Sequence, residues 1–161
     1  MKPAIPLKPG DEAPDFRLRG PGGVFYSLSE YRGDKHVLLA FYPLAFSPVC
    51  SHQLPELQKA LPGLEAAGIT VMGISVDSHY ANAAFGRAAQ LGFPLLSDWR
   101  REVSAAYGVL NADAGASGRA LFLVDRQGRL VWSEISENPG SIEAIPSPER
   151  ALAALAAAPR D

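Results

Sequence analysis

Residues 36–50 read HVLLAFYPLAFSPVC, and this stretch decides the fold. The uninterrupted apolar residues 37–42 predict a strand that is buried on both faces, as in a parallel sheet. Ser47 is a favourable N-cap residue and Pro48 suits the first position of a helix, so a helix is expected to follow directly. A buried strand joined to a helix in this way indicates an α/β fold.

The chain's only cysteine, Cys50, lies at this junction and falls at the third helical position when Ser47 is the cap. Free N–H groups and the positive end of the helix dipole stabilise a negatively charged sulfur in the first turn. The Ser47 hydroxyl can also donate a hydrogen bond to it. The sequence therefore predicts a reactive thiolate. The alternative is an inert core residue, because free cysteine also behaves as a small hydrophobe.

Composition indicates one globular domain over residues 1–161, with 47% apolar residues, 20% charged residues and a net charge of -2. That charge argues against a nucleic-acid or anionic-membrane surface. No apolar run approaches the length of about 18 residues that a membrane span requires. Residues 1–6 lack the apolar block of a signal peptide, and one cysteine cannot form an intrachain disulfide. We therefore expect a cytoplasmic protein.

The N-terminal third predicts a hairpin ahead of the central strand. Residues 1–14 contain four prolines and read as an extended arm. Alternating residues 15–18 and apolar residues 24–28 predict two short strands joined by a glycine-rich turn at 20–23. One helical turn is expected at 29–33.

The rest of the chain alternates helices and strands. The helix after Ser47 is expected to end at Gly68 and to be kinked or split by Pro55 and Pro62. Asp77 or Ser78 can cap a second helix. The remaining expected elements are strands 69–76, 93–96, 119–124 and 130–135, helices 79–91 (closed by Gly92), 100–107 and 148–158, a loop at 111–118 and a hairpin turn at 125–129. This order predicts a thioredoxin-like fold: a central mixed β-sheet flanked by helices, with an N-terminal β-hairpin extension.

Arg119 opens the strand 119–124. Because strand ends and helix starts meet at one edge of such sheets, its guanidinium can point at the thiolate; on spacing alone, an ordinary solvated arginine is the alternative. The three histidines and Cys50 have no zinc-ligand spacing, and His52 should point away from Cys50 on the helix. No nucleotide-binding motif is present, so neither a metal nor a cofactor is expected.

Residues 43–50 resemble the peroxiredoxin motif Pro-x-x-x-Thr/Ser-x-x-Cys, and the likeness extends along most of the chain. Within the AhpC/TSA family, the chain is most similar to the single-cysteine, alkyl hydroperoxide reductase E type of bacteria. Ser47 stands where threonine is commoner, and Gln53 stands where many members have glutamate. The other similar segments are 10–16, 73–78, 93–98, 106–109, and Arg119 with 122–128.

The resemblance implies a thiol-dependent peroxidase that reduces hydrogen peroxide and organic hydroperoxides through a Cys50 sulfenic acid. Arg119, Ser47 and Pro43 are implied to act with Cys50, and Val49, Ser47 and Arg119 to contact the substrate. Gln53 is implied only as a residue that supports these side chains without contacting the substrate. An external thiol (thioredoxin, a glutaredoxin-like protein or a low-molecular-weight thiol) must then reduce the sulfenic acid, because no resolving cysteine exists.

The resemblance also implies a homodimer, with the segments around Phe46, Tyr80 and Trp99 near its interface. Two other functions stay open at this point. A thiol transferase would exchange disulfides and be insensitive to peroxide. A peroxide sensor or holdase would turn over slowly and pass its oxidation to a partner protein.

Overall fold

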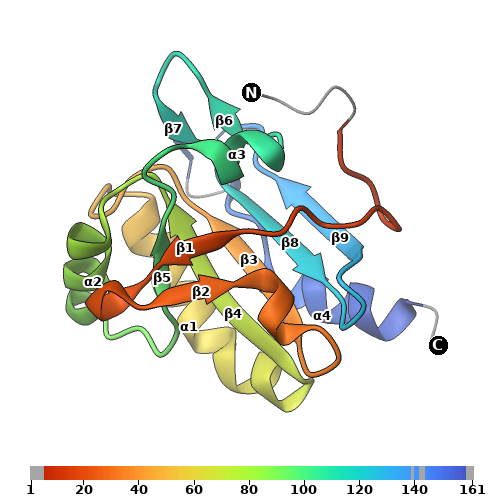
Figure 1. Ribbon diagram of the computed structural model, residues 1–161. Helices are drawn as coiled ribbons and strands as arrows, with labels where there is room; N and C mark the ends of the chain where they lie inside the picture. Colours follow the sequence, from red (N-terminus) through yellow and green to blue (C-terminus); the bar gives the residue numbers. More distant parts are fainter. Residues whose placement is uncertain (1–5, 139, 142–143, 159–161) are drawn as a thin grey trace.

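A seven-stranded mixed sheet forms the centre of the computed structural model, which describes residues 6–138, 140–141 and 144–158 (Figure 1). The expectation about a signal peptide falls mostly on residues outside this description. The strand order is β2-β1-β5-β4-β3-β8-β9. The strands are β1 (Arg17–Arg19), β2 (Phe25–Ser27), β3 (His36–Phe41), β4 (Ile69–Ser75), β5 (Leu95–Ser97), β8 (Ala120–Val124) and β9 (Leu130–Ile135).

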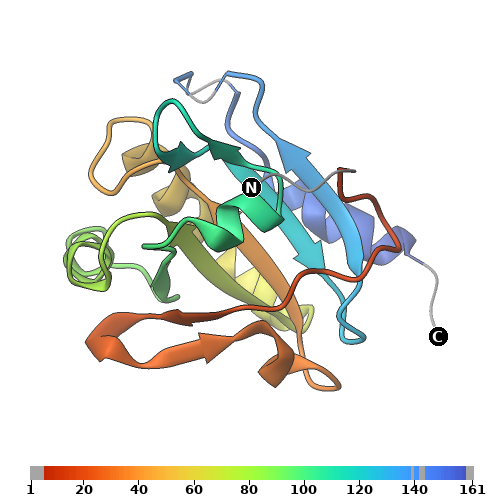
Figure 2. The same cartoon turned by 45° about the horizontal axis from the view of Figure 1, so that its top comes forward.

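The central strand pairs of the sheet are parallel, and the pairs on either side of them are antiparallel. Strand β3 pairs in parallel with β4 and antiparallel with β8, while β4 pairs in parallel with β5. The hairpin β1–β2 joins this sheet through β5 and extends one edge, as predicted (Figure 2). The helices are α1 (Cys50–Ala66), α2 (His79–Ala88), α3 (Glu102–Ala106) and α4 (Pro148–Ala157), and the 3-10 turns are η1 (Pro21–Gly23) and η2 (Leu28–Tyr31).

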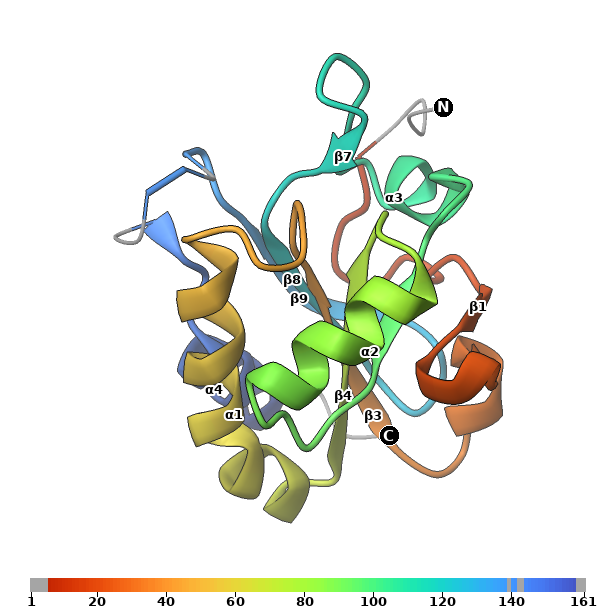
Figure 3. The ribbon, with the colours of Figure 1, turned by 90° about the vertical axis from the view of Figure 1, so that its left-hand side faces the viewer.

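Each face of the sheet has its own apolar core. Alternate residues of β3 point to opposite faces, with Leu38 and Ala40 in one cluster and Leu39 and Phe41 in the other. The first cluster includes side chains of α1, α2 and α4, and Figure 3 shows α1 and α4 side by side. The second cluster includes residues of α3, η2 and the N-terminal arm. Helices and turns thus flank both faces of the sheet.

The prolines were expected to kink or split helix α1; the helix is continuous over Cys50–Ala66, so they do not split it. Pro55 and Pro62 both lie inside it. Each proline costs about 3 kcal/mol in a helix interior. Burial of a leucine side chain contributes about 1.5–3 kcal/mol, and four leucines of α1 are buried, so packing on the sheet outweighs the missing hydrogen bonds. These leucines are Leu54, Leu57, Leu61 and Leu64.

Several other boundaries differ from prediction: α3 spans Glu102–Ala106 rather than 100–107, and β5 spans Leu95–Ser97 rather than 93–96. Helix α2 ends at Ala88 rather than Leu91, because Gln90 adopts a left-handed backbone with φ 53° before Gly92 is reached. Ser78, one of two expected caps, accepts a hydrogen bond from the Ala81 N–H at 3.1 Å. Residues 111–118, expected to be a loop, contribute to a small hairpin of β6 (Leu110–Asn111) and β7 (Ala116–Ser117), whose strands are too short to show alternation.

Candidate active site

Cys50 is the first residue of α1 and has no exposed surface. The prediction that Ser47 caps the helix is wrong by two residues, since the N-cap is Val49. Phe46 adopts a left-handed backbone with φ 66°, and the Ser51 N–H donates to the Ser47 carbonyl at 2.9 Å. A turn therefore already follows Ser47, and the regular helix begins after it.

Arg119 lies directly beside the sulfur. Its Nη1 donates to Cys50 Sγ at 3.0 Å, and the whole side chain is buried, so the alternative of a solvated arginine is wrong. The register of the sheet explains this position. Phe41, the last residue of β3, pairs with Ala120, the first residue of β8. Arg119 therefore lies at the same end of the sheet as the start of α1.

Gln53 lies one helical turn after Cys50 and is buried with it. Its Oε1 accepts a hydrogen bond from Arg119 Nη1 at 2.6 Å, and its Nε2 donates to the Phe41 carbonyl at 3.5 Å. The same guanidinium nitrogen thus contacts both the sulfur and the amide oxygen. A neutral amide oxygen orients the arginine without adding a negative charge that would compete with a thiolate.

The remaining predicted residues occupy the loop 42–49 between β3 and α1. Pro43, Ser47 and Val49 are each half-buried. Within the described part of the chain, no acceptor takes a hydrogen bond from the N–H groups of Val49 and Cys50, and none joins Ser47 Oγ to the sulfur. Among the described residues, the Arg119 guanidinium is therefore the group that hydrogen-bonds the sulfur. His52 is exposed, as predicted.

Two structural features are absent from the described residues, 6–138, 140–141 and 144–158. These residues contain no cluster of three or more histidine, cysteine, aspartate or glutamate side chains that could hold a metal ion. Likewise, no helix among them is both long and apolar enough to cross a bilayer.

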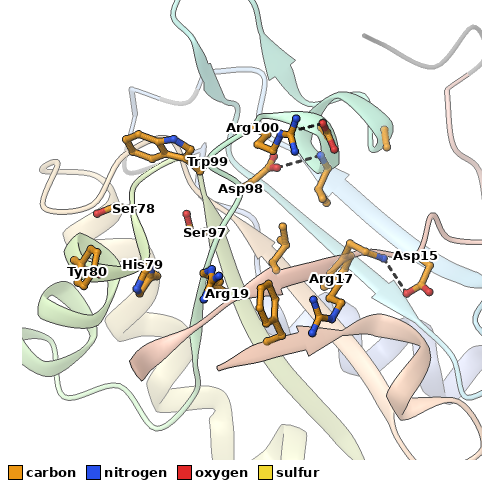
Figure 4. A pocket seen from close by; sticks show the side chains of 16 residues that line it. Asp15, Arg17, Arg19, Ser78, His79, Tyr80, Ser97, Asp98, Trp99 and Arg100 are labelled. Carbon is orange, nitrogen blue, oxygen red and sulfur yellow. Dashed lines mark hydrogen bonds and ion pairs between the residues drawn. The ribbon is translucent and has the colours of Figure 1, made fainter. Parts of the chain in front are cut away.

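A separate groove of about 1000 Å³ lies between the N-terminal hairpin, the start of α2 and α3 (Figure 4). Neither Cys50 nor Arg119 lines it. Tyr80 and Trp99, which were expected near a dimer interface, lie at this groove and are 76% and 64% exposed.

A comparison with known protein families identifies the family to which this chain belongs. Residues 9–133 match the AhpC/TSA family. The chain is a peroxiredoxin of this family. Peroxiredoxins reduce hydroperoxides with electrons from thiols, and a single cysteine fits the one-cysteine form of that thiol-dependent peroxidase mechanism.

Individual relatives support this assignment. This peroxiredoxin is 39% identical to alkyl hydroperoxide reductase E of Mycobacterium tuberculosis over 94% of its own length and 99% of the relative's. It is 33% identical to the chloroplastic 2-Cys peroxiredoxin BAS1 of Spinacia oleracea, covering 91% and 58% of the two chains.

Solved structures agree. Peroxidoxin BcpB of Mycobacterium tuberculosis matches with a TM-score of 0.83 and 29% identity over 96% and 99% of the two chains. The reduced 2-Cys peroxiredoxin of Plasmodium vivax matches with a TM-score of 0.80 and 31% identity over 91% and 79%. The predicted family and the thioredoxin-like fold are both confirmed.

Sequence reasoning missed a set of polar residues around the loop 42–49. Asp77 was interpreted only as a possible helix cap, and Asn82 was not singled out. Both residues form hydrogen bonds to the loop. The available signal was a polar residue at the carboxyl end of a buried strand, the position where functional groups of α/β sheets gather.

Proposed function

We propose that the Cys50 thiolate attacks the terminal oxygen of a hydroperoxide, forming an S–O bond as the O–O bond breaks. The sulfur is oxidised to sulfenic acid, and the leaving hydroxide or alkoxide takes a proton to give water or an alcohol. The observation that carries this proposal is the Arg119 guanidinium at 3.0 Å from a fully buried sulfur. A cation in that position favours the anionic sulfur and stabilises charge that develops on the peroxide oxygens.

The neighbouring groups have distinct roles in this proposal. The N–H groups of Val49 and Cys50 donate to a peroxide oxygen, and the Ser47 hydroxyl positions the other. Pro43 covers one side of the sulfur and limits further oxidation by excluding water and a second peroxide. Gln53 acts through Arg119, whose Nη1 it contacts at 2.6 Å.

Recycling requires a second molecule. With one cysteine, the chain cannot resolve its sulfenic acid internally. An external thiol attacks the Cys50 sulfur, releasing water and forming a mixed disulfide, and a second thiol then displaces Cys50. The reductant is thioredoxin, a glutaredoxin-like protein or a low-molecular-weight thiol. The cycle uses no metal and no organic cofactor.

The working unit is proposed to be a homodimer of single-domain chains, residues 1–161, in the cytoplasm. Phe46, Tyr80 and Trp99 are exposed aromatic residues, and such residues favour interfaces over free surface. A net charge of -2 gives no reason to expect a nucleic-acid partner.

The test compares the wild-type protein with Cys50→Ser, using Ser51→Ala at the exposed neighbouring position as the matched control. One equivalent of peroxide should add one oxygen, about 16 Da, to wild type and to Ser51→Ala. Cys50→Ser should gain no mass and reduce no peroxide. Full peroxidase activity in Cys50→Ser would refute the proposal. Slow turnover with every thiol, together with a trapped partner disulfide, would favour the sensor or holdase instead.

A further inference from the structure

Two hydrogen bonds attach the loop 42–49, hereafter the active-site loop, to Asp77, which precedes α2, and to Asn82 within α2. The Ala45 N–H donates to Asp77 Oδ2 at 2.8 Å. The Tyr42 hydroxyl donates to Asn82 Oδ1 at 2.6 Å, and both of these side chains are fully buried. The two attachments lie on either side of Pro43, so they fix the position of this part of the loop.

Both acceptors are in turn held by the central strands. Ser75 Oγ lies 2.8 Å from Asp77 Oδ2 and 3.1 Å from Asn82 Oδ1, and its single proton serves one of them at a time. Asn82 Nδ2 donates to the Leu96 carbonyl at 3.2 Å. The Ser97 hydroxyl donates to the Asp77 carbonyl at 2.6 Å. The network therefore connects the active-site loop to β4 and β5.

Because the side chains of Tyr42 and Asn82 are buried, the hydrogen-bond network favours a single conformation of the active-site loop. A buried hydroxyl or amide without a partner is costly, so Tyr42 and Asn82 favour the arrangement in which they bond each other. Burial also raises the pKa of Tyr42 far above its ordinary value, so its hydroxyl keeps the proton that it donates. Aromatic packing adds a third attachment, because the Phe46 and Phe85 ring centroids are 4.9 Å apart.

We propose that Asp77 is a positioning residue for the peroxidase reaction, acting through the backbone of the active-site loop. This inference rests on the proposed function of Cys50. Asp77 accepts the N–H of Ala45, which lies between Pro43 and Ser47, the two loop residues that the proposed function places around the substrate. Without that acceptor the loop loses one of its three attachments, and peroxide oxygens are held less closely in line with the sulfur. The sulfur and Arg119 stay where they are, because α1 and β8 hold them.

The experiment measures two rates for each variant: oxidation of Cys50 by hydrogen peroxide and alkylation of Cys50 by iodoacetamide. Peroxide reduction needs an oriented substrate, whereas alkylation needs only an accessible thiolate. The variants are Asp77→Ala and Asp77→Asn, whose amide oxygen can still accept from Ala45. The control is Asp125→Ala, because the Asp125 carboxylate likewise accepts backbone N–H groups, those of Gln127 and Arg129, but lies at the opposite end of β8.

Asp77→Ala should oxidise more slowly by about 10- to 100-fold, the range that a misplacement of about 1 Å produces. Its alkylation rate should stay equal or rise, and Asp77→Asn should recover most of the peroxide rate. Asp125→Ala should match wild type in both rates. An unchanged peroxide rate in folded Asp77→Ala overturns the inference, as does a parallel fall of both rates in Asp77→Ala that Asp77→Asn does not reverse.

Two further results distinguish a failure of the inference from a folding defect in the variant and from a failure of the proposed function. Hydrogen exchange of the Ala45 N–H in the wild-type protein should be slow. Exchange as fast as that of an exposed amide overturns the inference even if Asp77→Ala does not fold. If wild type itself fails to react with peroxide, the proposed function fails; if wild type reacts and Asp77→Ala reacts equally fast, only the positioning role fails.

Discussion

Replacement of Arg119 by methionine is the perturbation that most directly tests the electrostatics of the site. Methionine fills a similar volume without the charge. The guanidinium nitrogen lies 3.0 Å from the sulfur. At an effective dielectric constant of about 20, opposite unit charges at that distance attract by about 5 kcal/mol. The net effect is smaller, because burying the pair costs part of that energy in desolvation.

Loss of one buried donor aimed at developing charge slows enzymes by about 10²- to 10³-fold, and we expect a fall in that range for Arg119→Met. The assay is stopped-flow oxidation by hydrogen peroxide under pseudo-first-order conditions. Arg119→Lys should be intermediate, because it keeps the charge but not the planar fork. A rate for Arg119→Met within about threefold of wild type would refute the electrostatic reasoning, since a factor of three corresponds to under about 1 kcal/mol.

Two controls separate charge from folding. Arg126→Met removes an exposed arginine at the far end of β8, so it changes net charge equally and should leave the rate unchanged. Arg119→Met also leaves Gln53 Oε1 without this donor, at a cost of about 1–3 kcal/mol in stability. The double variant Arg119→Met with Gln53→Leu should regain stability in urea unfolding but not activity.

Three further outcomes follow from other contacts. Ser47→Ala should slow peroxide reduction by about three- to tenfold, the value of one hydrogen bond, while Ser47→Thr should keep the wild-type rate in the same stopped-flow assay. Tyr107→Phe removes the bond from its hydroxyl to the Pro14 carbonyl and should lower the free energy of unfolding by about 1 kcal/mol in urea. Burial, and then the nearby Arg126, lower the pKa of His36 below 6.5, so the unfolded chain binds this proton more readily. The fold should therefore lose stability as pH falls below about 6.5, and His36→Gln should reduce that loss in unfolding curves at several pH values.

Long periodic segments could be predicted from sequence, whereas local geometry could not. The apolar run 37–42 and the strand at 69–76 were correct to within one residue at each end, because burial on both faces leaves a clear pattern. The start of α1 was misplaced because a serine and a proline fit a cap on propensity alone. The sequence does not indicate that the backbone of Phe46 adopts a left-handed conformation.

The site was only partly predictable for a similar reason. Cys50 was found from its position after a buried strand, which is a local signal. Arg119 depends on the antiparallel register of β3 and β8, which joins residues far apart in sequence. Its place at the start of a strand favoured an ordinary surface arginine. Only the resemblance to peroxiredoxin motifs singled out Arg119 as a candidate site residue. The bonds from Tyr42 to Asn82 and from Ala45 to Asp77 likewise span more than 30 residues.

The complete enclosure of Cys50 has a consequence for the order of events in turnover. A molecule as small as hydrogen peroxide needs only a narrow opening, but a protein thiol must bring its own backbone within a few ångströms of the sulfur. The conformation that suits oxidation therefore shuts out any large electron donor. If the reductant is a protein, each catalytic round must include a moment when the first turn of α1 comes away from Arg119, and the frequency of that opening sets an upper limit on regeneration.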